Sequence, residues 1–127
     1  MAIRKHKVKV STAGSAGSAV GSGLAVTGIG RLVAVHVDYA ATAPATTDLT
    51  LTSEGDPDGP ASVALLAVAN TVTDGWYYPT NVAVDAVGAL VAGLGVPPVV
   101  HAGAIGVSLA QCNALTDAAI VSLYVES

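Results

Sequence analysis

The chain has few of the side chains that usually fill a core or keep a surface apart from other proteins. Among its 127 residues there is no phenylalanine and only one cysteine, and 11% of the residues are charged, against about 25% in an ordinary soluble domain. The single cysteine excludes an intrachain disulfide, and we expect Cys112 to be a small buried apolar residue. Apolar content comes largely from alanine and valine, which bury little area each, so the core of a monomer would be thin. Together these features favour a protein whose surface is covered by other protein.

Signals for membrane insertion are also missing. The basic N-terminus is followed by small polar residues rather than an apolar segment, and Ala2 stands where N-myristoylation needs a glycine. The uncharged run from residue 86 to 116 contains Pro97-Pro98, several glycines and His101, which favours short strands and turns. We therefore expect no membrane partner.

Charge is distributed unevenly. Four of the five basic residues, Arg4, Lys5, Lys7 and Lys9, lie in the first nine positions, and they are the candidate interface residues of the N-terminus. The rest of the chain has one arginine against nine carboxylates, a net charge of −8. A body of this charge lacks the basic face that a phosphate backbone requires, so nucleic acid is not an expected partner.

The N-terminal segment alternates in character. In "RKHKVKV", residues 4–10, the three lysines share one face and the histidine and two valines share the other, which is the period of a strand. We expect this segment to dock on a neighbouring subunit or on the sheet of its own chain. A Gly/Ser-rich stretch follows it. The sequence thus predicts an extended arm over residues 1–23 and a folded domain over residues 24–127.

Short alternating segments separated by turn residues continue to the C-terminus. After the arm, strands are predicted over residues 31–40, 48–54, 62–72, 81–87, 104–111 and 119–126. In the first, Val33, Val35, Val37 and Tyr39 are expected on one face and Leu32, Ala34, His36 and Asp38 on the other. In the third, Val63, Leu65 and Ala67 are expected to share a face. For the end of the 104–111 segment and the turn after it, a short helix over residues 108–118 is the rival interpretation. The fold class predicted is all-β, a single antiparallel β-sandwich or jelly roll.

Chemistry-bearing motifs are weak. The turn "EGDPDG" places Glu54, Asp56 and Asp58 close together, but it lacks the later glutamate of a calcium loop, so we predict a solvated turn and no metal. His36 and His101 have no evident third ligand, and we interpret both as structural. No nucleophile motif or phosphate-binding loop is present. The sequence therefore predicts a protein that is not an enzyme and has no cofactor.

The stretch "DGWYYPTN" concentrates the rings of an aromatic-poor chain. Adjacent strand residues point to opposite faces, so Trp76 and Tyr78 should share one face and Tyr77 the other. We expect the Trp76 face to be buried as core packing and Tyr77 to be exposed as an interface residue. Packing of all three rings in the core is the alternative.

Several segments resemble a family of small structural proteins of tailed bacteriophages. They are "TAGSAGSAVGSG", "GRLVAVHVDYAATAPATTDLTLT" and "LLAVANTVTDGWYYP", which together span about residues 11 to 80. "PATTDLTLT" and "NTVTDGWYYP" are the most specific parts, whereas the Ala/Val/Gly run after residue 80 departs from the pattern.

The resemblance implies a capsid decoration (cement) protein that binds the outer face of the phage head. Its partner would be the major capsid protein of the same virus, whose neighbouring subunits it would hold together. It also implies a homo-oligomer, most often a trimer, located on the virion after assembly in the host cytoplasm. Two alternatives stay open: a head–tail connector or tail component, and a carbohydrate-binding β-sandwich module whose exposed rings stack on sugars.

Overall fold

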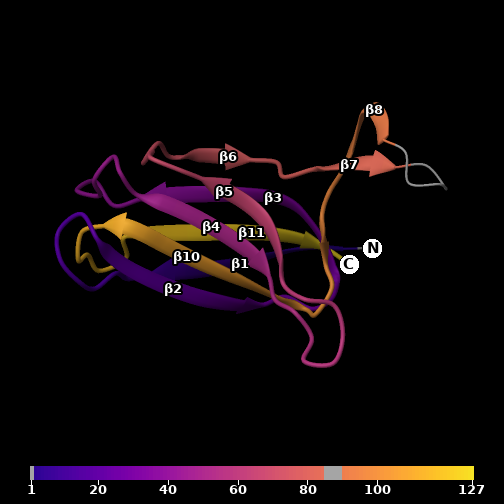
Figure 1. The fold of residues 1–127 in the computed structure, drawn as a ribbon, viewed down its shortest axis with the longest axis horizontal. Helices are drawn as coiled ribbons and strands as arrows, with labels where there is room; N and C mark the ends of the chain where they lie inside the picture. The colour runs from indigo at the N-terminus through magenta and orange to yellow at the C-terminus, as the bar shows by residue number, and fades with distance from the viewer. Residues whose placement is uncertain (1, 85–89) are drawn as a thin grey trace.

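Two antiparallel sheets packed face to face form the body of the molecule (Figure 1). The computed structural model describes residues 2–84 and 90–127. Its strands are β1 (Ile3–Val10), β2 (Ala19–Val26), β3 (Gly30–Tyr39), β4 (Asp48–Ser53), β5 (Val63–Val68), β6 (Gly75–Tyr77), β7 (Asn81–Val84), β8 (Leu90–Val96), β9 (Val99–Val100), β10 (Ala104–Cys112) and β11 (Ala119–Glu126). The predicted all-β sandwich is confirmed.

Each sheet is named here after a central strand. The β3 sheet has the order β1-β11-β3-β6, with β9 also paired to β3, and the β4 sheet has the order β2-β10-β4-β5. Aliphatic side chains from both sheets fill the space between them. The largest fully buried ones are Leu32, Leu49, Leu51, Ile105, Leu109, Leu123, Val10, Val35, Val37, Val100, Val107 and Val121. No phenylalanine is needed because many leucine and valine side chains interdigitate.

The N-terminal segment is part of the sandwich rather than an arm beside it. Strand β1 pairs with β11 along its whole length, from Ile3 opposite Glu126 to Val10 opposite Ala119. Val8 and Val10 are buried in the core, while the three lysines of β1 are exposed, as the alternation predicted. The predicted boundary between residues 23 and 24 falls inside β2. Burial of the two valines ties the basic segment to its own sheet.

Two glycines of the Gly/Ser-rich stretch allow the sandwich to close at this edge. A Cβ at Gly23 would lie 2.5 Å from Val8 Cγ1, and one at Gly21 would overlap the backbone oxygen of Ser11. Strand β1 can therefore approach β2 closely only where β2 has no side chains on its inner face. The glycines serve packing between sheets rather than contact with a phosphate group.

Two register shifts change which residues face the core. Opposite β11, the register of β3 shifts between Ala34 and Leu32, so Leu32 is buried together with Val35. The predicted placement of Leu32 on the opposite face from Val35 is therefore wrong. A β-bulge inserts one extra residue and inverts the alternation beyond it.

A second shift changes the facing of β5. Leu66 and Val68 lie opposite the buried leucines of β4, whereas Val63 and Ala67 are exposed. The shift lies at Leu65, which also packs against the core. The predicted common face of Val63, Leu65 and Ala67 is therefore not formed, because Leu65 packs against the core whereas Val63 and Ala67 are exposed.

Other segments match their prediction. Leu49 and Leu51 of β4 are buried, and so are Ile105, Val107 and Leu109 of β10. Strand β10 runs on to Cys112, which is fully buried with a free thiol, so the rival helix over residues 108–118 is not formed.

Strands β7 and β8 pair only with each other and extend away from the two sheets in Figure 1. The predicted strand over residues 81–87 is described as far as Val84, and the expected turn at Gly88 lies outside the described residues. Gly95 is part of β8, a strand that the sequence did not predict.

Candidate interaction surface

An aromatic cluster lies on the outer face of the β3 sheet. Trp76 of β6 is directly opposite His36 of β3, and their ring centroids are 4.9 Å apart in an edge-to-face arrangement. The Trp76 ring is stacked with Tyr78 at 6.5 Å and tilted against Tyr124 of β11 at 5.4 Å. Three separate strands and the segment after β6 therefore place four rings together on one surface.

The rings of the aromatic stretch point the opposite way from the prediction. Trp76 is 50% exposed and Tyr78 67% exposed, whereas Tyr77 is half-buried and packs against the core. Tyr77 lies opposite the buried Val35 of β3, which fixes its side of the sheet. Trp76 and Tyr78 share a face, as expected, but it is the outer one, and Tyr77 supplies the core packing.

Hydrogen bonds anchor the loop that leads into β6. The Asp74 carboxylate accepts the backbone N–H of Tyr39 at 2.7 Å, where β3 ends. At the start of the loop, the Asp48 carboxylate accepts the backbone N–H of Asn70 at 2.9 Å. The bond from Asp74 satisfies the Tyr39 N–H, which lies at the end of β3 and would otherwise lack a partner. The loop is tied at both ends, so Trp76 enters the sheet at a defined register.

Tyr39 is the buried aromatic residue behind this loop. Burial raises the pKa of the Tyr39 hydroxyl to about 12, and the nearby Tyr77 and Asp74 add to the rise. Among the described residues, no group makes a hydrogen bond to this hydroxyl. The neutral phenol is therefore the form that the folded protein stabilises.

A row of lysines lies on the same outer face. In the pairing of β1 with β11, Lys5 is opposite Tyr124, and Lys7 and Lys9 are opposite Ser122 and Ile120. Side chains directly opposite each other in an antiparallel pair point to the same side of the sheet. The lysines therefore border the aromatic cluster. We call this surface the aromatic–lysine face; it consists of Lys5, Lys7, Lys9, His36, Trp76, Tyr78 and Tyr124.

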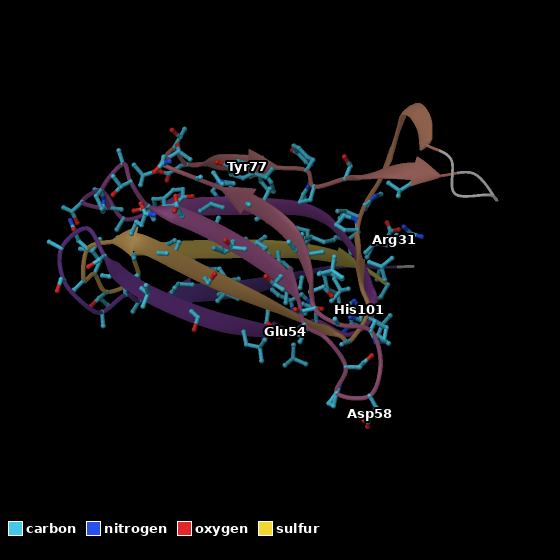
Figure 2. The ribbon with its side chains drawn as sticks, viewed as in Figure 1. Arg31, Glu54, Asp58, Tyr77 and His101 are labelled. Atoms are coloured by element: carbon cyan, nitrogen blue, oxygen red, sulfur yellow. The ribbon has the colours of Figure 1, made fainter. Side chains whose placement is uncertain are left out.

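The remaining predicted interface residues lie elsewhere. Arg4 is exposed, but it lies opposite the buried Val125. Its side chain therefore points to the other side of β1 from the three lysines. Tyr77, labelled on β6 in Figure 2, belongs to the core side. Sequence reasoning missed Trp76, His36, Tyr78 and Tyr124 as members of the surface. The sequence did indicate that Tyr78 is exposed. In a strand, residues 74, 76, 78 and 80 point to the same side, and Asp74 and Thr80 are polar.

The acidic turn does not gather its carboxylates. Glu54 lies at the base of the loop between β4 and β5, and Asp58 lies at its tip (Figure 2). The Glu54 side chain lies over Gly106, where a Cβ would meet its Oε1 atom. No group of three potential metal ligands occurs among the residues that the structure describes.

His101 takes a structural position beside β4. Its ring Nδ1 is 3.2 Å from the Ser53 hydroxyl, which also accepts the backbone N–H of His101 at 3.3 Å. His36 and His101 lie on different features of the sandwich, one in the aromatic cluster and the other at the β9–β10 turn.

Comparisons of the chain with protein-family models, curated proteins and solved structures give no match. In the described ranges there is no helix that could span a membrane. Function must therefore be inferred from the sequence motifs and from the chemistry of the aromatic–lysine face.

Proposed function

We propose that this protein is a structural component of a virus particle. Specifically, it is a capsid decoration (cement) protein that binds the outer surface of a tailed-phage head and stabilises contacts between subunits of the major capsid protein. The aromatic–lysine face carries this proposal. It combines exposed rings, which are enriched at protein contacts, with a row of cations at its border.

The charge pattern favours a protein partner. Three lysines on one edge strand suit an acidic protein surface, because complementary charge steers encounter and fixes orientation. The chain after residue 9 has a net charge of −8 and would repel a phosphate backbone. The partner surface should therefore be acidic opposite β1 and apolar opposite Trp76.

A carbohydrate-binding module is the second candidate. The observation in its favour is that Trp76, the only tryptophan, is half-exposed beside the more exposed Tyr78. Because Trp76 is unique, intrinsic fluorescence reports directly on this face. A saturable change in emission with soluble oligosaccharides would favour this candidate; unchanged emission over the same range favours the decoration protein.

The proposal is tested on heads of the virus that encodes the protein. Heads assembled without it should be mixed with the purified chain and imaged by electron cryomicroscopy. We expect regular added density on the outer surface, between neighbouring capsid subunits. Density confined to the neck or tail would support the connector alternative, and no added density would overturn a role in the particle.

A further inference from the structure

The four end strands of the two sheets differ in how they are protected. Sheet edges carry unpaired N–H and C=O groups, and proteins block them with lysines, short strands or bulges. Here β1 carries three lysines, β6 has three residues and β5 has a register shift. Strand β2 has neither a charged residue nor a proline among its eight residues. Its pairing with β10 contains a register shift at the Ala19–Gly21 end, but the extra residue belongs to β10 and not to β2.

The open part of the β2 edge is short and well defined. On the side of β2 that faces away from β10, Ala13 and Val20 exchange two backbone hydrogen bonds, at 3.0 and 3.1 Å. Since backbone groups of a strand alternate in direction, those of Ser22, Leu24 and Val26 also point away from β10. With respect to residues 2–84 and 90–127, the edge is therefore occupied at Val20 and open from Ser22 to Val26.

The side chains around this edge are apolar or small. Leu24 is 60% exposed and Val26 76% exposed. Ser22, Leu24 and Val26 lie opposite Ser108, Gly106 and Ala104 of β10, respectively. No charged residue occurs between residues 11 and 30. An approaching second copy of this acidic chain would therefore meet no like charge on the edge strand itself; the Glu54 carboxylate lies over Gly106, one strand in from the edge.

We propose that β2 pairs with β2 of a second copy in antiparallel orientation, with Leu24 on the two-fold axis. Ser22 then lies opposite Val26 of the second copy, and each Leu24 exchanges both hydrogen bonds with its equivalent. This register uses the three residues whose backbone groups point outward and leaves Val20 with Ala13. Centring the pair on Ser22 would instead require the groups of Val20 that Ala13 already occupies.

The pairing joins two four-stranded sheets into one continuous eight-stranded sheet. It is independent of what binds the aromatic–lysine face, which belongs to the other sheet. Pairing of this kind gives a dimer, whereas the trimer implied by the family resemblance needs a different contact.

Cysteine cross-linking tests the register. Equivalent Cα atoms at the axis would be about 5.5 Å apart in a hydrogen-bonded pair, within the range that a disulfide spans. In Leu24→Cys, mild oxidation should therefore give a covalent dimer. In Val26→Cys, the equivalent atoms would be about 13 Å apart, so the same treatment should leave monomer. Cys112 is buried, and the unsubstituted chain serves as the control.

A mixture of Ser22→Cys and Val26→Cys should give the mixed dimer, which neither variant gives alone. No cross-linking of Leu24→Cys, or equal cross-linking of Val26→Cys, would overturn the pairing proposed.

Sedimentation of the chain at increasing concentration provides a second measurement. The unsubstituted protein should shift from monomer to dimer, and Leu24→Lys should remain monomeric. Val63→Lys is the matched control, because Val63 is a half-exposed valine on the opposite end strand β5. A monomer at every concentration, or equal loss of dimer in both variants, would contradict the proposal.

Discussion

Trp76 lies directly across from His36 on the outer face of the β3 sheet, with ring centroids 4.9 Å apart and ring planes at 65°. This pairing fixes which side of the sheet each residue of β6 faces. Because Trp76 faces outward with His36, Tyr77 faces the core beside Val35. The largest side chain of the protein is therefore a surface residue. Its smaller neighbour performs the packing that was expected of Trp76.

The two aromatic neighbours should respond differently to truncation. Tyr77→Ala removes a half-buried ring from the core and should cost about 2–3 kcal/mol of the free energy of unfolding. Trp76→Ala loses only its contacts with other surface rings and should cost about 1 kcal/mol. Thermal or denaturant unfolding of both variants measures the difference. If Trp76→Ala lost as much unfolding free energy as Tyr77→Ala, or more, the assignment of Tyr77 to the core and Trp76 to the surface would be contradicted.

Close approach of β1 to β2 predicts a strict requirement for glycine at position 21. A methyl group there would overlap the Ser11 carbonyl oxygen, a backbone atom that cannot move alone. Gly21→Ala should therefore cost about 1–3 kcal/mol through overpacking. Gly75→Ala is the matched control, since a Cβ at Gly75 meets nothing within 4 Å. Similar melting temperatures for the two variants would refute the close approach.

Tyr39 should make the protein sensitive to alkali. The folded state raises the pKa of its hydroxyl from 10.0 to about 12, mainly through burial. Because the raised pKa stabilises the neutral form, this contribution is complete below about pH 10 and is lost as the pH rises toward 12. Between pH 10 and 12, the melting temperature of the unsubstituted chain should therefore fall more steeply than that of Tyr39→Phe. A difference between the two melting temperatures that stays constant over this window would contradict the prediction.

Removal of the unpaired Tyr39 hydroxyl has a second consequence. Near neutral pH, Tyr39→Phe should be as stable as the unsubstituted chain or slightly more stable, because a buried hydroxyl without a partner is costly. A clear loss of stability at neutral pH would reveal a hydrogen bond that the described residues do not supply.

The lysine row can be tested without disturbing the fold. Replacing Lys5, Lys7 and Lys9 together by Gln should leave the melting temperature nearly unchanged, since all three are exposed. Binding to heads should weaken, and its dependence on salt should become shallower. Arg31→Gln, a basic residue outside the face, is the control. Binding with an unaltered salt dependence would exclude the lysines from the contact.

Deletion of residues 1–10 is a poor substitute for that experiment. An arm separate from the folded domain, as predicted over residues 1–23, could be removed without unfolding the sandwich. In the structure the deletion removes Val8 and Val10 from the core and leaves β11 without its β1 partner. We expect the truncated chain to unfold or aggregate, because it exposes a new sheet edge.

Alternation predicted most strands and failed where its period is interrupted. The faces of β4 and β10 follow from leucine and valine at every second position. The faces of Leu32 and Ala67 do not, because one extra residue in β3 and in β5 inverts the phase across each shift, and no proline or glycine marks either one. Bulges of this kind depend on how neighbouring strands pair, which lies beyond the local sequence.

The candidate surface was predictable only in part. The lysine row follows from the alternation of β1, but its place on the same face as Trp76 needs the strand order β1-β11-β3-β6. Tyr124 joins the cluster from the last strand, 48 positions after Trp76. The size of its side chain suggested that Trp76 is buried. Asp74 and Thr80, which point to the same side of the strand as Trp76 and are polar, indicated that it is exposed.

The occupancy of Trp76→Ala on heads assembled without the protein tests the central claim most directly. Density for this variant on the outer surface should fall well below that of the unsubstituted chain at equal concentration. Val63→Ala, which truncates an exposed residue of the other sheet, should bind fully. Full occupancy of a folded Trp76→Ala, or equal losses for both variants, would contradict the assignment of the aromatic–lysine face as the capsid-binding surface.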